Sequence, residues 1–387
     1  MHERTALAEA DVSDAALTDL VATLLGHPAA DVTLLESSAE IAPYDLEALT
    51  TAGRYRVRGR AATPAGEQPF SFFVKVVQSW GRTPLFAFVP PELRELALAS
   101  VPWQIEPTIY RSDLPERLPT GLSMPTAFAV NDIDDESAAI WLQDIDVVPL
   151  GWDTARCARA AYLLGRLAAS PRVRPLAGVG RNGQPIVRAY AEGRVAGQLV
   201  PALISDEIWG HPLIAGAFDD ELHARLVAAA RNLGSLVDEL AAAPLGAFHG
   251  DACTRNLLVE RASGEFVLID YGFWGEGPLG FDLAQLLIGE VQMGERSAAE
   301  LPELEKACLT AYVEGLRAEG CEVPFEVIER AHALQMLLFA GLSAIPLEHL
   351  DEIPTPELQR IARERADSAR FILDLVDATA QTRSGVS

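Results

Sequence analysis

Residues 248–259 read FHGDACTRNLLV, and residues 263–272 read SGEFVLIDYG. The first stretch interrupts an Ala- and Leu-rich half of the chain, and the second contains an apolar run that ends at Asp270. Together they predict a loop, a short strand, a turn and a second strand that ends on a carboxylate. A carboxylate at the exit of a buried strand is costly unless a cation or hydrogen-bond donors satisfy it.

These two stretches bring together the groups that phosphoryl transfer requires. Asp251 and Asn256 share one loop, and Asp270 follows on the next strand. Oxygen atoms of Asp and Asn suit Mg²⁺, which takes few protein ligands and leaves its other positions to water and phosphates. Asp251 would then be available to accept a proton from a substrate hydroxyl. Positioning, a metal and a base near the nucleophile are what this chemistry needs.

The rest of the sequence predicts an α+β fold with two lobes. Residues 54–77 favour a β-hairpin, and residues 127–130 and 139–142 favour two more strands. Beyond residue 150, helical periodicity dominates the segments 158–169, 222–242, 304–318, 326–342 and 356–380. We therefore expect a β-rich N-lobe of residues 1–145 and a helical C-lobe of residues 146–387. The joint is expected at residues 143–149.

Three ordered motifs resemble the aminoglycoside phosphotransferase and choline kinase family, which is related to the protein kinases. They are HGDxxxxN at residues 249–256, IDYG at 269–272 and GFDLA at 280–284. The ordered set is far more specific than any one motif, and the resemblance spans roughly residues 32–287. It implies a bilobal protein-kinase-like fold, with a small antiparallel sheet in the N-lobe, which binds the nucleotide. The catalytic loop, the metal loop and the acceptor site would belong to the helical C-lobe.

The resemblance also assigns roles to residues. Asp251 would be the catalytic base, Asn256 and Asp270 would hold Mg²⁺, and Lys75 would reach the α- and β-phosphates of ATP. Lys75 stands in the apolar run FVKV (residues 73–76), where an ammonium group needs an anionic partner. Glu106 looks like the helix glutamate that pairs with this lysine, with Glu95 as the competitor.

Other positions follow the family pattern or depart from it. The joint at Gln143 and Ile145 would run alongside the adenine ring and offer it backbone hydrogen-bonding groups. His249 is expected to hold the loop through a hydrogen bond rather than to react, and Asp282 to be a helix N-cap that braces the catalytic loop. The segment 44–53, by contrast, contains one glycine, so no Gly-rich phosphate loop is visible. The sequence does not distinguish ATP from GTP.

Two further departures favour a small-molecule acceptor. Gly250 stands where protein kinases carry an arginine that reads a phosphorylated activation loop, and residues 272–282 are too few to dock a polypeptide. The net charge of −24 over 387 residues disfavours nucleic acid and anionic membranes, and tolerates a cationic acceptor. Four acceptor classes fit these features: aminoglycosides, amino sugars, nucleoside antibiotics and choline-like alcohols. An aminoglycoside acceptor would imply a role in antibiotic resistance. The oligomeric state is not indicated.

The remaining sequence features suggest an ordinary cytoplasmic enzyme. The four cysteines form no CxxC pair and no zinc spacing, and the first residues lack the pattern of a signal peptide. The longest apolar stretch, residues 334–346, is too short to span a bilayer. Two alternatives remain. One is a catalytically silent kinase-like binding protein. The other is a metal-dependent phosphatase that would use His249 and Asp251 as ligands, although it would need more histidines nearby.

Overall fold

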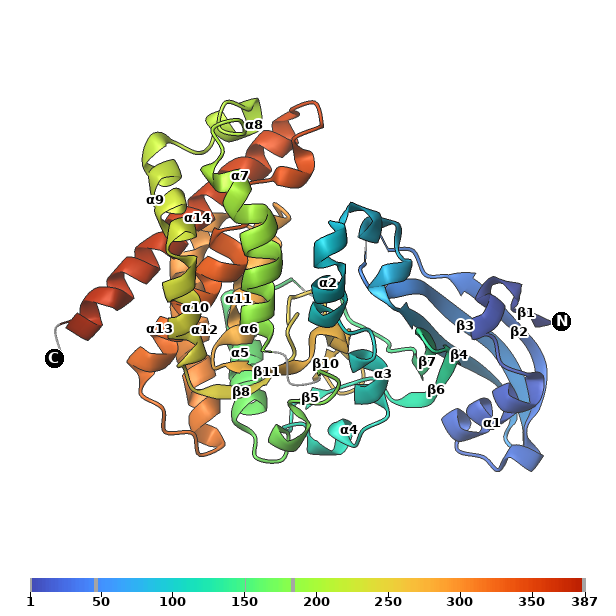
Figure 1. Ribbon diagram of the computed structural model, residues 1–387. Coiled ribbons are helices and arrows are strands. Elements are labelled where there is room, and N and C mark those ends of the chain that lie inside the picture. The colour runs from blue at the N-terminus through green and yellow to red at the C-terminus, as the bar shows by residue number, and fades with distance from the viewer. Residues whose placement is uncertain (1, 45–47, 150, 182–184, 385–387) are drawn as a thin grey trace. The chain divides into compact units, whose positions relative to one another are not determined.

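The computed structural model describes residues 2–44, 48–149, 151–181 and 185–384 (Figure 1). The chain divides into two compact units. Unit 1 comprises Met1–Arg117, Ser123–Val148 and Val259–Phe273. Unit 2 comprises Leu118–Leu122, Pro149–Leu258 and Trp274–Ser387.

Unit 1 is built on a six-stranded sheet in the order β1-β2-β3-β4-β7-β6 (Figure 1). Its first pair is parallel and the others are antiparallel. The hairpin expected over residues 54–77 is formed by β3 and β4, which turn at Gly66 with a φ of 105°. The strands are β1 (His2–Glu3), β2 (Thr33–Ile41), β3 (Thr51–Thr63), β4 (Gly66–Gln78), β6 (Ala127–Asp134) and β7 (Ser137–Gln143).

The two faces of this sheet differ because side chains alternate along a strand. Val57 of β3 and Phe72 and Val74 of β4 lie in a core that includes Leu17 and Val21 of helix α1 (Asp14–Leu25). The opposite face of β3 carries four arginines at every second position, which are Arg54, Arg56, Arg58 and Arg60. Lys75 is paired with Arg54 across β3 and β4, so it lies on the arginine face.

Unit 1 also contains three short α-helices between β4 and β6. They are α2 (Arg94–Ser100), α3 (Ile105–Tyr110) and α4 (Leu114–Arg117). Strand β10 (Phe266–Leu268) leads into Asp270. Helix α3 contacts residues 271–273, where the rings of Tyr110 and Tyr271 meet edge to face at 5.7 Å. This contact fixes α3 beside the segment that carries Asp270.

Unit 2 is mainly helical, with a two-stranded sheet of β8 (Leu245–Phe248) and β11 (Gly275–Pro278). Helices α5 and α12 approach each other so closely that a Cβ atom on Gly165 would lie 2.1 Å from the carbonyl oxygen of Tyr312. The absence of a side chain at Gly165 therefore permits this contact. The helices are α5 (Thr154–Ala169), α6 (Ile186–Tyr190), α7 (Val200–Ile204), α8 (Pro212–Ala215), α9 (Asp220–Arg231), α10 (Leu233–Ala241), α11 (Phe281–Gln292), α12 (Leu301–Ala318), α13 (Phe325–Met336) and α14 (Pro356–Ser384).

The architecture confirms the expected α+β class, with an antiparallel sheet in the N-terminal region and a helical C-terminal part. The division of the chain differs in detail from the expected boundary after residue 145. The first unit continues to Val148 and also includes Val259–Phe273. The segment around Asp270 therefore groups with the β-rich unit rather than with the helical one.

Candidate active site

In unit 1, a buried cluster of charges surrounds Lys75. Its Nζ atom lies 2.7 Å from Oε2 of Glu106 and 2.9 Å from Oδ1 of Asp270. Lys75 and Glu106 are 4% and 2% exposed. Burial acts to lower the pKa of Lys75, but the charges of Asp270 and Glu106 outweigh it and raise that pKa above its ordinary value. The ammonium group is therefore held in its charged form.

The elements around Lys75 explain this geometry. Lys75 lies in β4 between β3 and β7, opposite Arg54 on one side and Ile140 on the other. Glu106 comes from the first turn of α3. It is the glutamate that pairs with Lys75, whereas Glu95 lies on α2 and is exposed.

The backbone at Asp270 is unusual. Its φ of 67° is in the left-handed region, which is uncommon for a residue other than glycine. Such a conformation costs on the order of 1–3 kcal/mol and is typical of functional sites. The carboxylate lies between two cations, since its Oδ2 atom is 3.8 Å from Nη2 of Arg54. The sequence analysis did not predict that Arg54 lies at this site. The alternation of four arginines on a strand opposite Lys75 was the available signal.

In unit 2, the loop after β8 positions Asp251 and Asn256. The side-chain nitrogen of Asn256 donates to the backbone oxygen of Asp251 at 2.9 Å and to its Oδ2 atom at 2.8 Å. The backbone N–H of Asp251 donates to Nδ1 of His249 at 3.3 Å. His249 is fully buried and forms the loop hydrogen bond that was expected of it. The loop thus presents the Asp251 carboxylate in a fixed orientation.

Asp282 braces this loop through hydrogen bonds to its backbone. Its carboxylate accepts hydrogen bonds from the backbone N–H groups of His249 and Gly250, each at 2.8 Å. Burial raises the pKa of Asp282 to about 6, although the two N–H donors act to lower it. The expected brace is therefore present. The expected N-cap is wrong, because Gly280 occupies that position in α11 and Asp282 lies in the first turn.

The joint residues lie where β7 ends. Gln143 is the last residue of that strand, and its N–H donates to the carbonyl oxygen of Thr126. Ile145 follows outside the sheet. Between them, Asp144 accepts hydrogen bonds from Nε of Arg56 at 2.8 Å and from Oγ of Ser71 at 2.6 Å. A second arginine of β3 therefore anchors the joint.

The predicted site residues form two groups. Lys75, Glu106 and Asp270 are in contact within unit 1, and Asp251 and Asn256 are in contact within unit 2. The convergence of Asp251, Asn256 and Asp270 on one ion stays a prediction.

The chemistry of these donors fits magnesium. Because the amide nitrogen of Asn256 donates to Asp251, its carbonyl oxygen is the atom left to act as a ligand. Asp270 adds a carboxylate. Within the described parts of the chain, no group of three or more His, Cys, Asp or Glu side chains could hold a metal ion. An amide oxygen and a carboxylate are ligand types that suit Mg²⁺ when it is bound together with phosphates.

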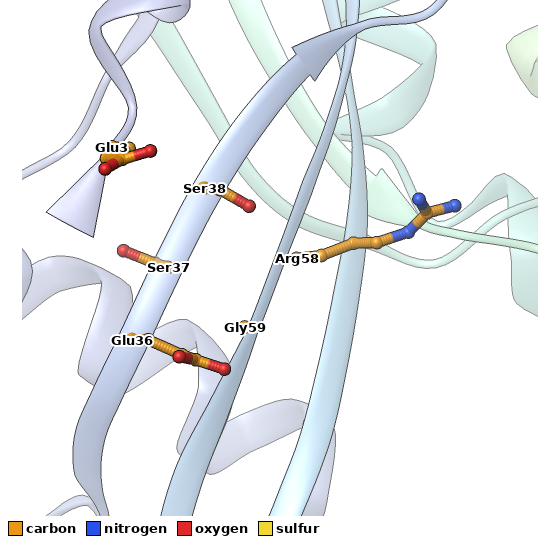
Figure 2. A pocket seen from close by; sticks show the side chains of 6 residues that line it. All are labelled: Glu3, Glu36, Ser37, Ser38, Arg58 and Gly59. Atoms are coloured by element: carbon orange, nitrogen blue, oxygen red, sulfur yellow. The ribbon is translucent and has the colours of Figure 1, made fainter. Parts of the chain in front are cut away.

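A hollow of about 460 Å³ lies elsewhere in unit 1, on strands β1 to β3 (Figure 2). Two of its charged side chains form ion pairs, since Glu36 pairs with Arg60 and Arg58 pairs with Glu40. The residues that line it are Glu3, Glu36, Ser37, Ser38, Arg58 and Gly59. None of the predicted site residues is among them.

Comparisons with known proteins bear on the helical part and on the fold. Residues 153–318 match the family model APH, described as the phosphotransferase enzyme family. No curated protein matches the chain at a significant level. Among the described residues, no helix is long and apolar enough to cross a membrane.

Solved structures with a similar chain fold include three kinases. An aminoglycoside phosphotransferase from Alicyclobacillus acidocaldarius subsp. acidocaldarius is 16% identical, with 88% of this chain and 93% of that chain covered and a TM-score of 0.49. An ethanolamine kinase from Plasmodium vivax is 9% identical, with 90% and 85% covered and a TM-score of 0.48. An aminoglycoside phosphotransferase from Streptomyces rimosus is 19% identical, with 76% and 91% covered and a TM-score of 0.38.

The family match agrees with the three motifs from which the site residues were predicted, and with the expected protein-kinase-like class of fold. Over residues 153–318, the chain is similar to the phosphotransferase enzyme family.

Proposed function

We propose that this protein transfers the γ-phosphoryl group of ATP, with Mg²⁺, to a hydroxyl group of an aminoglycoside, amino sugar, nucleoside antibiotic or related alcohol. In this proposal Asp251 is the catalytic base, Asn256 and Asp270 hold the metal, and Lys75 binds the phosphates. The backbone around Gln143 and Ile145 receives the adenine.

The observation that carries the proposal is the buried ion pair of Lys75 and Glu106 beside Asp270. Taking these charges out of water is expensive, and apolar side chains of similar size would pack at lower cost. Their retention is explained if Lys75 must present a fixed positive charge to phosphate oxygens. Glu106 then sets the position of the ammonium group, and Asp270 is held ready beside it.

The loop of unit 2 supports the second half of the proposal. Asn256 orients the carboxylate of Asp251 through a 2.8 Å hydrogen bond. An oriented carboxylate can accept the proton of an acceptor hydroxyl as that oxygen attacks the γ-phosphorus. A magnesium ion held by Asn256 and Asp270, as the resemblance implies, would neutralise charge on the transferred group.

The acceptor class rests on charge and on what the loops lack. The chain carries a net charge of −24, which favours a cationic acceptor over an anionic one. Gly250, which offers no side chain for reading a phosphorylated loop, donates its N–H to Asp282 instead. The segment between Asp270 and Asp282 forms a short turn and β11. These features support a small molecule rather than a polypeptide as acceptor.

The experiment measures ADP release by the full chain with Mg-ATP and a panel of hydroxylated aminoglycosides, amino sugars, nucleosides and choline-like alcohols. We expect ADP release that depends on one acceptor class, with a phosphomonoester in the product. Mg-ATP binding without turnover on any acceptor would favour the catalytically silent binding protein. Release of inorganic phosphate from phosphomonoesters, without ATP, would favour the phosphatase.

A further inference from the structure

Arg54 approaches the same carboxylate as Lys75. The two residues are directly opposite each other in the register of β3 and β4. Lys75 contacts Oδ1 of Asp270 at 2.9 Å, and Nη2 of Arg54 lies 3.8 Å from Oδ2. Two cations from adjacent strands therefore flank the residue to which the proposed function assigns the metal.

Arg54 differs from the other arginines on its face of β3. Arg56, Arg58 and Arg60 each form a hydrogen-bonded ion pair of 2.6 to 2.8 Å, and their side chains are 32% to 54% exposed. The side chain of Arg54 is 14% exposed. Its 3.8 Å contact with Asp270 is too long for a hydrogen bond, so this contact does not use its donors. Partial burial of such a group is costly unless hydrogen-bond acceptors satisfy its donors, and phosphate oxygens can do so.

The guanidinium group is also held in place. It stacks over the ring of Tyr44 at 3.6 Å from the ring centroid. The backbone oxygen of Arg54 accepts a hydrogen bond from the N–H of Ala42 at 2.9 Å, which ties the chain after β2 to β3. The fork of donors is thus pre-positioned, and little side-chain entropy remains to be lost when an anion binds.

The sequence of the neighbouring segment is not that of a Gly-rich phosphate-binding loop. A Gly-rich loop presents successive backbone N–H groups to phosphate oxygens. Residues 44–53 contain a single glycine, Gly53. A planar cation beside the metal-binding carboxylate can replace those donors, because guanidinium geometry matches two phosphate oxygens at once.

We propose that Arg54 is a triphosphate-binding residue that donates two hydrogen bonds to oxygens of the β- and γ-phosphates, in place of a Gly-rich loop. This inference rests on the proposed function, since it requires a nucleotide at Lys75. Without Arg54, the charges of Lys75, Glu106 and Asp270 leave a net negative cluster, which repels a triphosphate. With Arg54, the cluster is neutral and offers two cations.

The test compares binding of Mg-ATP and of adenosine to the full chain by isothermal titration calorimetry. We expect R54Q to weaken Mg-ATP binding by about 10- to 100-fold, the range for loss of a charge-assisted contact, and to leave adenosine binding unchanged. R54K keeps the charge but loses the fork, so its affinity for Mg-ATP should lie between those of R54Q and the wild type.

The matched control is R58Q. Arg58 lies on the same face of β3, and its partner Glu40 is more than half exposed. R58Q removes the same charge and should change Mg-ATP affinity less than about twofold. Thermal melts of all variants check that they fold.

Two results would overturn the inference while leaving the proposed function intact. In one, R54Q binds Mg-ATP like the wild type while K75M does not. In the other, R54Q loses Mg-ATP and adenosine affinity equally, so that the effect is not on the phosphates. A wild-type chain that binds no Mg-ATP would overturn both proposals together.

Discussion

Lys75 and Glu106 form a buried ion pair with 2.7 Å between Nζ and Oε2, and neither side chain is more than 5% exposed. Breaking such a pair from one side leaves an uncompensated charge in the interior, whereas replacing both partners by apolar groups does not. Comparing the single replacement with the double replacement therefore distinguishes the contribution of the pair to stability from its contribution to nucleotide binding.

We predict that K75M lowers the free energy of unfolding by about 3–5 kcal/mol, because Glu106 is then buried without its cation. The double variant K75M/E106L should recover most of that loss, yet bind Mg-ATP no better than K75M. Urea titrations of both variants measure the first effect and calorimetry the second. A double variant that recovers both stability and nucleotide affinity would show that Lys75 contributes no phosphate contact.

A second prediction concerns pH and Asp282, whose pKa burial raises to about 6. Between about pH 4 and pH 6 the folded state holds a proton on this carboxyl that the unfolded state has released. The free energy that Asp282 contributes to folding therefore falls as pH rises through this window, by about 3 kcal/mol in total.

D282N removes this titration, and the other ionisable groups are common to both proteins. We expect the difference in unfolding free energy, wild type minus D282N, to be larger at pH 4 than at pH 7. Urea denaturation at the two pH values provides the measurement. A difference that is the same at both would mean that Asp282 titrates in its ordinary range.

A third prediction concerns Gly280, which precedes the brace residue by two positions. Its φ is 93°, and a Cβ atom there would lie 3.3 Å from Cβ of the fully buried His332. Tyr312 and Gln335 bind the same turn, through the N–H of Gly280 and the carbonyl oxygen of Leu279. G280A should therefore disturb both the turn and Asp282.

The control is G320A, because Gly320 has a similar φ of 84° and nothing within 4 Å of its added Cβ. Both variants pay the backbone cost of about 1–2 kcal/mol. We expect only G280A to lose more stability than that and to lower turnover as well. Equal stability losses, with equal turnover, would contradict a link between this turn and the catalytic loop.

The sequence predicted the groups whose chemistry is local. Asp251 and Asn256 lie in one loop, so their contact follows from short spacing. Lys75 stood out because an ammonium group in an apolar strand requires a partner. The hairpin of residues 54–77 followed from its alternation and its turn, and the structure adds the full lengths of both strands.

Features that depend on tertiary packing were not predicted. The approach of Arg54 to Asp270 requires the register of β3 against β4, which a one-residue slip would reverse. The expected helix over residues 222–242 is two helices that meet at Asn232, a break that periodicity alone does not mark. Asp282 lies in the first turn of α11 rather than at its N-cap, and its carboxylate accepts hydrogen bonds from two N–H groups of a loop 32 to 33 residues away, a long-range contact that local spacing does not mark.

The central claim is that Asp251 acts as the base in phosphoryl transfer to an alcohol. It is tested most directly by the rate of ³²P transfer from [γ-³²P]ATP to the acceptor found in the panel, in the wild type, D251N and the exposed-loop control D351N. We predict that D251N lowers this rate by about 10²–10⁴-fold while Mg-ATP affinity and thermal stability hold, and that D351N matches the wild type. A D251N rate within a few-fold of the wild type would contradict the account.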